Sequence, residues 1–411
     1  MKAAILVIGD EIISGHTLDT NSNYLANALN ELGISVVEIV SVGDRVEEIA
    51  SELKALLGKA DIILTSGGLG STHDDVTKRA IAEALSRKLV LEESVIESIT
   101  KRADPNRMPK RWMLESIATL PEGSILFENP LGLAPGVGVI DGDKIIYLLP
   151  GVPCELKAIF ESSVLDHIAR RASGKMLRRR VLRTAGLAES EVSEALKDWL
   201  ESTTIRVGML PEISGVTLRL TAIDDDPARA EHLLDEETQK ILGLLGDAVY
   251  STEGKSIEQV VGEILIQRNL RVAVAESCTG GLIGHLLTEI PGISACLDRV
   301  LVTYSNSAKV ELLGVPEEVI AAYGAVSAEV ARAMALGVRE RSGVDIGLST
   351  TGIAGPSGGS ESKPVGLVYM AVTNGERVIV KKRIFRGMRS AVKMRAAYHT
   401  LNMLRLFLLR G

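Results

Sequence analysis

Over the first 170 residues, short apolar runs alternate with longer segments whose apolar residues recur at helical spacing. The runs at 3–8, 34–40 and 62–65 predict strands, and the segment at 21–32 predicts a helix. A further helix is expected between the second and third strands. Strands separated by helices are typical of a parallel, doubly wound α/β sheet. We therefore predict an α/β domain over residues 1–170.

A different order of elements follows over residues 171–250. The pattern predicts a strand, a helix, two strands and a helix, over residues 178–183, 189–200, 205–210, 216–222 and 228–245. This order predicts a small α+β domain. The composition then becomes polar at 251–255, which we interpret as a linker to a third domain, α/β in class, over residues 255–411.

The third domain contains two apolar runs that each lead into a glycine-rich segment. The run 272–275 is followed by Glu276-Ser277-Cys278-Thr279-Gly280-Gly281, and a helix is predicted from Leu282. The run 345–348 is followed by the glycine-rich segment 349–359. Loops at the carboxyl ends of strands in an open α/β sheet face one crevice, so we expect these two segments to share a site.

Ser277 lies where a predicted strand changes to a predicted helix, and the residues after it are small. This position suits an exposed nucleophile beside an oxyanion hole, or a cradle for phosphate. The sequence is not G-x-S-x-G, so it does not match the α/β-hydrolase turn. A glycine-rich turn without catalytic function is the structural alternative. Cys278 competes as nucleophile because a thiolate is intrinsically more reactive than a hydroxyl group.

A catalytic serine needs a base. The histidines of this region, His285 and His399, lie inside predicted helices and are interpreted as helix-surface or core residues. Lys309 is the stronger candidate, because serine–lysine pairs occur in hydrolases and partial burial lowers the pKa of an amine. Tyr304 lies five positions earlier and could relay or orient the proton. A solvated helix lysine is the alternative interpretation of Lys309.

Two polar loops follow predicted strands in the first domain. One contains Asp10 and Glu11, and the other spans residues 66–77. Neither matches a dinucleotide fingerprint or a P-loop, yet bare glycines allow backbone N–H groups to approach an anion. Asp74 and Asp75 are candidates to hold a hard divalent cation against phosphates, with Asp44 as a further candidate. Capping of the following helix is the alternative role of the two adjacent aspartates.

Composition narrows the classes of protein. The chain has 411 residues, 46% hydrophobic and 24% charged, with a net charge of −7. Its acidic balance argues against broad nucleic-acid binding. Three cysteines are too few for a disulfide framework or zinc cluster, and no apolar run reaches the length of a membrane span. We predict a soluble, cytoplasmic protein that does not associate with membranes.

The motifs SCTGG, TYSNSAK, GAVS, TGIAGPSGG, KPVG and FRGMR occur in this order. They resemble the nicotinamide mononucleotide (NMN) deamidase domain of the CinA (competence/damage-inducible) family over residues 255–411. The resemblance implies hydrolysis of NMN to nicotinate mononucleotide and ammonia without a cofactor. It implies Ser277 as nucleophile, supported by Tyr304, Lys309 and Thr351. The implied substrate contacts are Thr279, Gly280, Gly281, Asn306, Gly352, Gly355, Arg386 and Arg389.

The arginine of this family pocket is left open among Arg386, Arg389 and Arg395, with Arg389 preferred. Lys393 and Arg395 lie at the start of the last predicted helix, where cations could hold a phosphate.

The motifs VIGDEIISG, TSGGLG with DDVT, ENPLGLAPG and LPGVPCELK resemble the molybdopterin-binding (MoCF) fold at the N-terminus of the same family. The resemblance implies a pyrophosphatase that splits ADP-ribose into AMP and ribose 5-phosphate with Mg, Mn or Co. Ser71 stands where the relatives usually have proline. The implied substrate contacts are Asp10, Glu11, Gly67, Gly68, Gly70 and Ser71, and the implied metal ligands are Asp44, Asp74 and Asp75.

The family also has a KH-like module in the middle. The only G-x-x-G here, at 243–246, is apolar and ends a predicted helix, so we interpret it as a helix cap. A spacer or dimerisation module is favoured, and a homodimer is expected. The resulting hypothesis is a bifunctional nucleotide-recycling hydrolase. The alternatives are a deamidase whose N-terminal domain binds a nucleotide or pterin without catalysis, or an accessory protein of competence or DNA damage.

Overall fold

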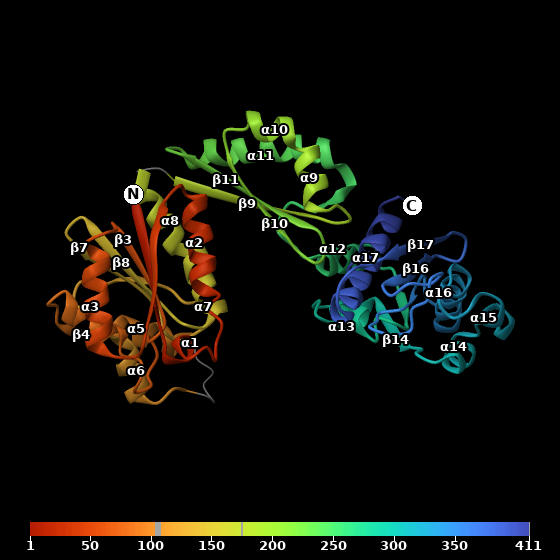
Figure 1. Ribbon diagram of the computed structural model, residues 1–411, viewed down its shortest axis with the longest axis horizontal. Helices are drawn as coiled ribbons and strands as arrows, with labels where there is room; N and C mark the ends of the chain where they lie inside the picture. Colours follow the sequence, from red (N-terminus) through yellow and green to blue (C-terminus); the bar gives the residue numbers. More distant parts are fainter. Residues whose placement is uncertain (103–107, 174–175, 411) are drawn as a thin grey trace. The chain divides into compact units, whose positions relative to one another are not determined.

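The computed structural model describes residues 1–102, 108–173 and 176–410. The chain forms two compact units, one of residues 1–178 with 223–230 and the other of residues 179–222 with 231–411 (Figure 1). No helix in these described ranges combines the length and apolar character needed to cross a membrane.

A six-stranded sheet forms the centre of the first unit. In spatial order its strands are β2 (Ser35–Val42), β1 (Lys2–Ile8), β3 (Ile62–Ser66), β8 (Lys144–Leu149), β7 (Gly136–Asp141) and β6 (Ile125–Phe127). The first four are parallel, and β7 and β6 are antiparallel additions. The sequence pattern predicted β1, β2 and β3 but not β8, β7 or β6. A short pair, β4 (Leu89–Leu91) and β5 (Thr119–Pro121), lies apart from this sheet.

Helices cover both faces of this sheet, which is why β1 is apolar at consecutive positions. Ala4 and Leu6 join the core formed with α3 and α4, and Ala3 and Ile5 join the core formed with α2, α7 and α8. The doubly wound arrangement is therefore confirmed. The helices are α1 (Asp10–Ile13), α2 (Asn21–Glu31), α3 (Val46–Leu57), α4 (Thr77–Ala84), α5 (Glu93–Arg102), α6 (Arg111–Ala118), α7 (Pro153–Ile159) and α8 (Leu165–Ser173).

The middle segment forms a four-stranded sheet in the order β10-β11-β9-β12. Its elements are β9 (Met176–Thr184), α9 (Glu189–Ala195), α10 (Lys197–Ser202), β10 (Arg206–Pro211), β11 (Val216–Asp224), α11 (Pro227–Leu245) and β12 (Val249–Ser251). The predicted helix 189–200 is interrupted at Leu196. The G-x-x-G sequence ends α11, and Gly246 adopts a φ of 52°, as expected for a C-terminal cap.

The C-terminal domain has a five-stranded sheet. Its strands, in spatial order, are β14 (Leu297–Val302), β13 (Val272–Glu276), β15 (Ile346–Gly352), β16 (Leu367–Thr373) and β17 (Val378–Ile384). Strand β13 is parallel to β14 and β15, and the other pairs are antiparallel. The helices are α12 (Ile257–Arg268), α13 (Leu282–Thr288), α14 (Asn306–Leu313), α15 (Glu317–Tyr323), α16 (Ala328–Ser342) and α17 (Arg389–Leu409).

Alternate residues of β13 serve two cores. Val272 and Val274 pack with α12, α13 and α17, and Ala273 and Ala275 pack with α16. Strand β15 continues to Gly352, so the first residues of the predicted glycine-rich loop belong to the strand. Both parallel strands end at the same edge of the sheet, where the N–H of Ser277 donates to the carbonyl oxygen of Thr350 at 3.0 Å.

Candidate functional site

Ser277 is the first residue after β13, and the chain turns sharply behind it. Gly280 and Gly281 have φ values of 62° and 93°, a region in which residues with a Cβ are strained. The hydroxyl groups of Thr279 and Thr350 lie 2.7 Å apart and join this turn to β15. The two glycine-rich segments therefore meet, as expected, and Ser277 is held between them with 8% of its surface exposed.

Glu276 fixes the other side of the turn. Its carboxylate is wholly buried and accepts the N–H groups of Gly281 at 2.9 Å, Ile283 at 3.2 Å and Gly284 at 2.9 Å. An internal anion thus occupies the start of α13, which counts against the phosphate-cradle interpretation. The sequence analysis gave Glu276 no role, although a carboxylate ending a buried strand is itself unusual.

The N–H groups of Cys278 and Thr279 form no hydrogen bond with another residue within the described part of the chain. They directly follow the serine, so both are available to an oxyanion formed on a substrate held at Ser277.

Lys309 lies in α14 and reaches Ser277 across 32 positions of sequence. Its side chain is almost fully buried, and Nζ lies 3.2 Å from Ser277 Oγ and 2.8 Å from the carbonyl oxygen of Thr303. Burial lowers the pKa of Lys309. A neutral amine in this position can donate to the carbonyl oxygen and accept the serine proton. The geometry that a serine–lysine pair requires is therefore present.

The competing groups are placed less favourably. Burial raises the pKa of Cys278 to about 12, so the thiol stays protonated. His285 lies on the surface of α13, 4.0 Å from Glu289, and its side chain is 64% exposed. His399 packs against the ring of Phe385, with 5.0 Å between the ring centroids. These contacts agree with the interpretation of both histidines as helix-surface or core residues.

Arg389, at the start of α17, connects three loops of the site. It donates to the carbonyl oxygen of Gly355 at 2.8 Å and to the hydroxyl group of Tyr304 at 3.0 Å. The hydroxyl group of Thr351 donates to the carbonyl oxygen of Ala325 at 2.7 Å, which joins β15 to the segment before α16. Tyr304 is 63% exposed and bonds to the arginine, so it lies at the rim of the site.

The remaining cations near the start of α17 are arranged differently. Arg395 donates to the carbonyl oxygen of Arg386, so these two residues bond to each other. Lys393 has no hydrogen-bond or ion-pair partner among the described residues, and its Nζ lies 3.5 Å from the position a Cβ would take at Gly280. Asn306 is exposed and makes no side-chain contact of this kind within the same ranges. Lys393 is thus the cation beside the serine turn, and Arg389 lies between Gly355 and Tyr304.

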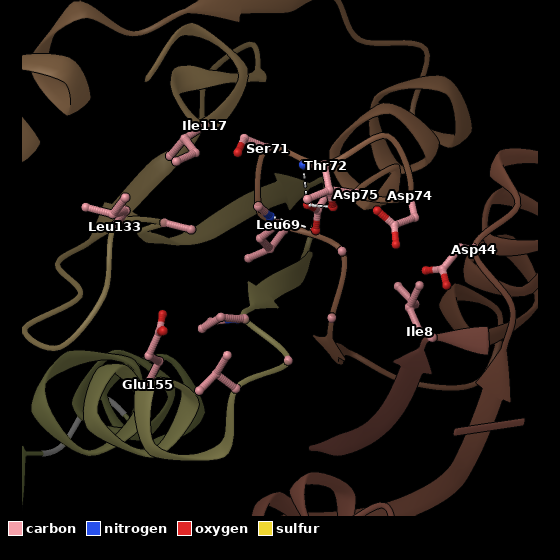
Figure 2. Close-up of a pocket in the computed structure, with 18 of the residues that line it drawn as sticks. Ile8, Asp44, Leu69, Ser71, Thr72, Asp74, Asp75, Ile117, Leu133 and Glu155 are labelled. Carbon is pink, nitrogen blue, oxygen red and sulfur yellow. Dashed lines mark hydrogen bonds between the residues drawn. The ribbon is translucent and has the colours of Figure 1, made fainter. Parts of the chain in front are cut away.

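A cleft of about 610 Å³ opens at the carboxyl ends of β1 and β3 in the first unit (Figure 2). It is lined by the segment Gly67–Asp75, by Gly9, Glu11 and Asp44, and by Glu155 from α7. Asp10 does not line it. Its backbone N–H donates to Asp44 at 2.9 Å, and its carboxylate accepts the N–H of Asp44.

Asp75 shapes the loop from within. Its carboxylate accepts the N–H groups of Gly70 and Thr72, both at 2.8 Å, and the hydroxyl group of Thr72 at 2.6 Å (Figure 2). The helix-capping role considered for the two aspartates is therefore wrong: no side chain among the described residues caps the start of α4, and Asp75 bonds within its own loop. The N–H of Gly67 donates to Leu149.

Because of these hydrogen bonds, the N–H groups that can bind an anion differ from those expected. From the sequence we expect the N–H groups of Gly67, Gly68 and Gly70 to bind the anion, but those of Gly67 and Gly70 donate to Leu149 and Asp75. The N–H groups of Gly68, Leu69 and Ser71 lack a partner among the described residues.

Asp44 and Asp74 are two of the five acidic residues that line this cleft, the others being Glu11, Asp75 and Glu155. Figure 2 shows the carboxylates of Asp44 and Asp74 directed toward each other. Burial, together with the nearby carboxylates of Asp10, Glu11 and Asp74, raises the pKa of Asp44. Within the described ranges, no three His, Cys, Asp or Glu side chains are grouped closely enough to hold a metal ion. The side chain of His73 is almost fully exposed.

Three polar residues that position this cleft were not singled out from sequence. Asn129 is buried and donates to Glu155 at 2.7 Å. Asn21 donates to Ser66 and to the carbonyl oxygen of Gly151. Their local sequence gives no signal, because Asn21 stands between Thr20 and Ser22 and Asn129 between Glu128 and Pro130.

Lys78 is the third of these residues. It is 6% exposed, and its amine donates to the carbonyl oxygen of Ser116 at 2.6 Å and lies 3.5 Å from that of Gly70. Burial lowers the pKa of Lys78 to about 8.

Comparison with known proteins places three family domains along the chain. Residues 4–170 match the probable molybdopterin binding domain, residues 179–251 match the damage-inducible protein CinA KH domain, and residues 254–408 match the CinA C-terminal domain. These matches agree with the fold class predicted for each part.

The chain is also similar to full-length relatives. It is 41% identical to a competence-damage inducible protein of Moorella thermoacetica and 39% identical to one of Caldicellulosiruptor saccharolyticus, and each match covers 98% of both chains. A solved structure from Agrobacterium tumefaciens, titled as a competence/damage inducible protein, is 40% identical. It covers 38% of this chain and 97% of its own, with a TM-score of 0.36.

Proposed function

Because the chain belongs to the competence-damage inducible protein (CinA) family, we propose that its C-terminal domain is a serine amidohydrolase that deamidates nicotinamide mononucleotide. The observation that carries this proposal is the 3.2 Å contact between a buried lysine, Lys309, and Ser277. A surface lysine would remain charged at neutral pH and could not accept a proton. The buried pair supplies both a nucleophile and a base.

The reaction proceeds through an acyl-enzyme. Ser277 Oγ attacks the carboxamide carbon while its proton passes to Nζ of Lys309, and the N–H groups of Cys278 and Thr279 stabilise the oxyanion. Lys309 then gives the proton to the departing nitrogen, the C–N bond breaks and ammonia leaves. Water attacks the ester, Lys309 takes a proton from it and returns one to Ser277, and nicotinate mononucleotide is released. No cofactor enters this sequence.

The cations of α17 support a nucleotide as substrate. Lys393 is unpaired beside the serine turn, and Arg389 already reaches from Tyr304 to Gly355. A phosphate accepted between these two side chains would place the rest of the nucleotide over Ser277. Free nicotinamide lacks this phosphate and should be a poor substrate.

For the N-terminal domain we propose a pyrophosphatase that splits ADP-ribose. Asp44 and Asp74 would hold a divalent cation (Mg, Mn or Co), because such ions bind through one or two carboxylates when substrate phosphates and water complete the coordination. The cation would offset the charge of the phosphoanhydride. The free N–H groups of Gly68, Leu69 and Ser71 support binding of the pyrophosphate group itself.

A second candidate for this domain is binding of a nucleotide or pterin without turnover. It is favoured by Asp75, whose carboxylate is committed to its own loop, so that two of the three predicted metal ligands remain available. The family name leaves a role in competence or DNA damage as a further alternative.

One experiment separates these functions. The purified chain is incubated separately with NMN, nicotinamide and ADP-ribose, each with added Mn²⁺ or with a chelator, and products are identified by chromatography and mass spectrometry. Ammonia from NMN in both conditions supports the deamidase, and its absence contradicts it. AMP from ADP-ribose only with metal supports the pyrophosphatase, whereas tight binding without products favours the second candidate. Sedimentation of the same sample tests the predicted homodimer.

A further inference from the structure

Strand β17 departs from the apolar alternation of its sheet. On the neighbouring β16, Val368, Met370 and Val372 are buried in the core formed with α17. Met370 pairs with Lys381 across the two strands, and Val368 pairs with Arg383. Cross-strand partners point to the same face, so two cations stand on the side that α17 covers.

These cations line a cavity of about 230 Å³ within the second compact unit. Helix α17 contributes His399 and Asn402 to its wall, and the middle segment contributes Gly186 and Asp247. The cavity is separate from the serine site, because none of the residues in its lining belongs to the turn after β13, to α14 or to the start of α17.

The charge around this cavity is unbalanced. Neither Lys381 nor Arg383 forms a side-chain hydrogen bond or ion pair with any described residue. The carboxylate in the lining, that of Asp247, is bonded to Arg410 at 2.6 Å. Burial lowers the pKa of Lys381, and the nearby Arg383 and Arg410 lower it further. An excess of positive charge therefore persists here, although the chain as a whole carries a net charge of −7.

His399 contributes no positive charge at neutral pH. Burial lowers the pKa of His399 to about 4, and Arg383, Lys381 and Arg395 contribute to this shift. The imidazole is thus uncharged at neutral pH, and its pKa responds to the charges of the two unpaired cations.

A structural role alone explains part of this arrangement. Charged side chains on edge strands prevent pairing with other sheets, and Lys382 serves this purpose on the opposite face, 5.9 Å from the ring centroid of Tyr369. Lys381 and Arg383 are solvent-exposed, yet both instead line a partly open cavity together with the amide of Asn402, whose nitrogen has no acceptor among the described residues. Convergent donors around a cavity are the arrangement that a ligand requires.

We propose that this cavity is an anion site that binds a phosphate group, either as inorganic phosphate or as the phosphate end of a small ester. Arg383 supplies the planar pair of donors that matches phosphate oxygens, and Lys381 supplies a point charge. The volume exceeds that of a bare phosphate, so a few carbon atoms of an ester also fit. The site lies where the middle segment meets the C-terminal domain, so a bound anion would join β17 to Gly186.

The test uses His399 as a local reporter, because phosphate also has reason to bind at the two proposed active sites. The full chain is labelled at its histidines, the signal of His399 is assigned with His399→Gln, and phosphate is added at constant ionic strength. A saturable shift of the His399 imidazole signal is expected, with an increase in the pKa of His399 when the site is filled. No saturable shift with either inorganic phosphate or ribose 5-phosphate would overturn the proposal.

Variants locate the effect. The double variant Lys381→Met with Arg383→Met should weaken the binding reported by His399 at least tenfold, and Lys382→Met, on the other face of the same strand, should leave it unchanged. The proposal is contradicted if the double variant binds phosphate as tightly as the parent chain, or if Lys382→Met weakens binding as much as the double variant does. If the double variant fails to fold, Arg383→Lys provides the same comparison, because it keeps the charge and loses the paired donors. Tighter binding of ribose 5-phosphate than of phosphate would assign the cavity to an ester, and the reverse to the free anion. No readout depends on turnover.

Discussion

The serine site and the N-terminal cleft both lie at the carboxyl ends of parallel strands, but their reactive groups are arranged in opposite ways. Around Ser277 the groups are buried and already bonded to one another. In the N-terminal cleft, Asp44 and Asp74 face each other as like charges, and Asp75 bonds to its own loop. The first site is organised before a ligand arrives, whereas the second needs a counter-charge to complete it.

This difference follows from the chemistry that each site would perform. Proton transfer between a hydroxyl and an amine requires a low-dielectric contact, which packing alone can create. Offsetting a phosphoanhydride requires positive charge, which the acidic cleft does not itself contain. The comparison can be tested by changing one group at a time.

The largest effect is expected from Ser277→Ala. Removal of the nucleophile should lower ammonia release from NMN by at least about 10³-fold, because the groups of such a site act as a unit. Cys278→Ala is the matched control and should retain activity, since its thiol is protonated. If Cys278→Ala loses activity and Ser277→Ala does not, the nucleophile is Cys278 and the assignment to Ser277 is wrong. ADP-ribose turnover should be unchanged in both.

Lys309→Arg should lower kcat/KM for NMN by about 10²–10³-fold, the range typical of a lost general base. Arginine keeps its charge and cannot accept the proton. In the parent protein the rate should rise with pH as Lys309 loses its proton, at a pH below the ordinary range of lysine because burial lowers its pKa. That acidic limb should vanish in the variant. An arginine variant with full activity and the same pH profile would exclude Lys309 as base.

Asp75→Asn should lower ADP-ribose turnover by about 10–100-fold, equivalent to about 1.4–2.8 kcal/mol in the transition state, and leave NMN turnover intact. The amide of the variant keeps one acceptor oxygen, so one of the hydrogen bonds from the N–H groups of Gly70 and Thr72 is lost. Kinetics at several Mn²⁺ concentrations show whether Asp75 shapes the loop or binds the metal ion. If Asp75 only shapes the loop, Asp75→Asn leaves the Mn²⁺ concentration required for turnover unchanged. Asp44→Asn should raise that concentration.

Glu276→Gln should lower kcat for NMN by about tenfold, or about 1.4 kcal/mol. The new amide nitrogen faces N–H groups that the carboxylate now accepts, so the turn that carries Ser277 is displaced. The pH profile should keep its shape, because Lys309 is untouched. A changed profile with unchanged kcat would indicate that Glu276 acts on the proton and not on the turn.

The last prediction, at Lys78, concerns the stability of the fold, and no effect on either reaction is expected. Its pKa is lowered to about 8 in the folded chain, so the unfolded chain binds more protons between pH 8 and the ordinary value of 10.5. Stability should therefore rise with pH across this window. Relative to Lys78→Met, the gain should be on the order of 3 kcal/mol. Urea unfolding followed by circular dichroism at several pH values measures it, and a difference that does not depend on pH would contradict the assignment.

Local patterns predicted much of this molecule. The positions of β1, β2 and β3, the turn after β13 and the interpretation of 243–246 as a cap all depend on neighbouring residues. The sequence pattern did not yield β8 and β14. Strands β6 and β7 were missed because they are short or antiparallel, and β17 was missed because it carries charges where apolar residues were expected. The break at Leu196 was missed because its helix keeps an apolar period on both sides.

The candidate reactive groups and the strand ends at which they lie could be predicted from the sequence, because glycine, hydrophobic period and residue chemistry are local properties. Which of these groups meet depends on the tertiary structure. Lys309 reaches Ser277 and is buried there, Asp75 turns to its own loop, and Glu276 occupies the start of α13. Distances and burial arise from packing between segments far apart in the chain, and these set each pKa and each free donor.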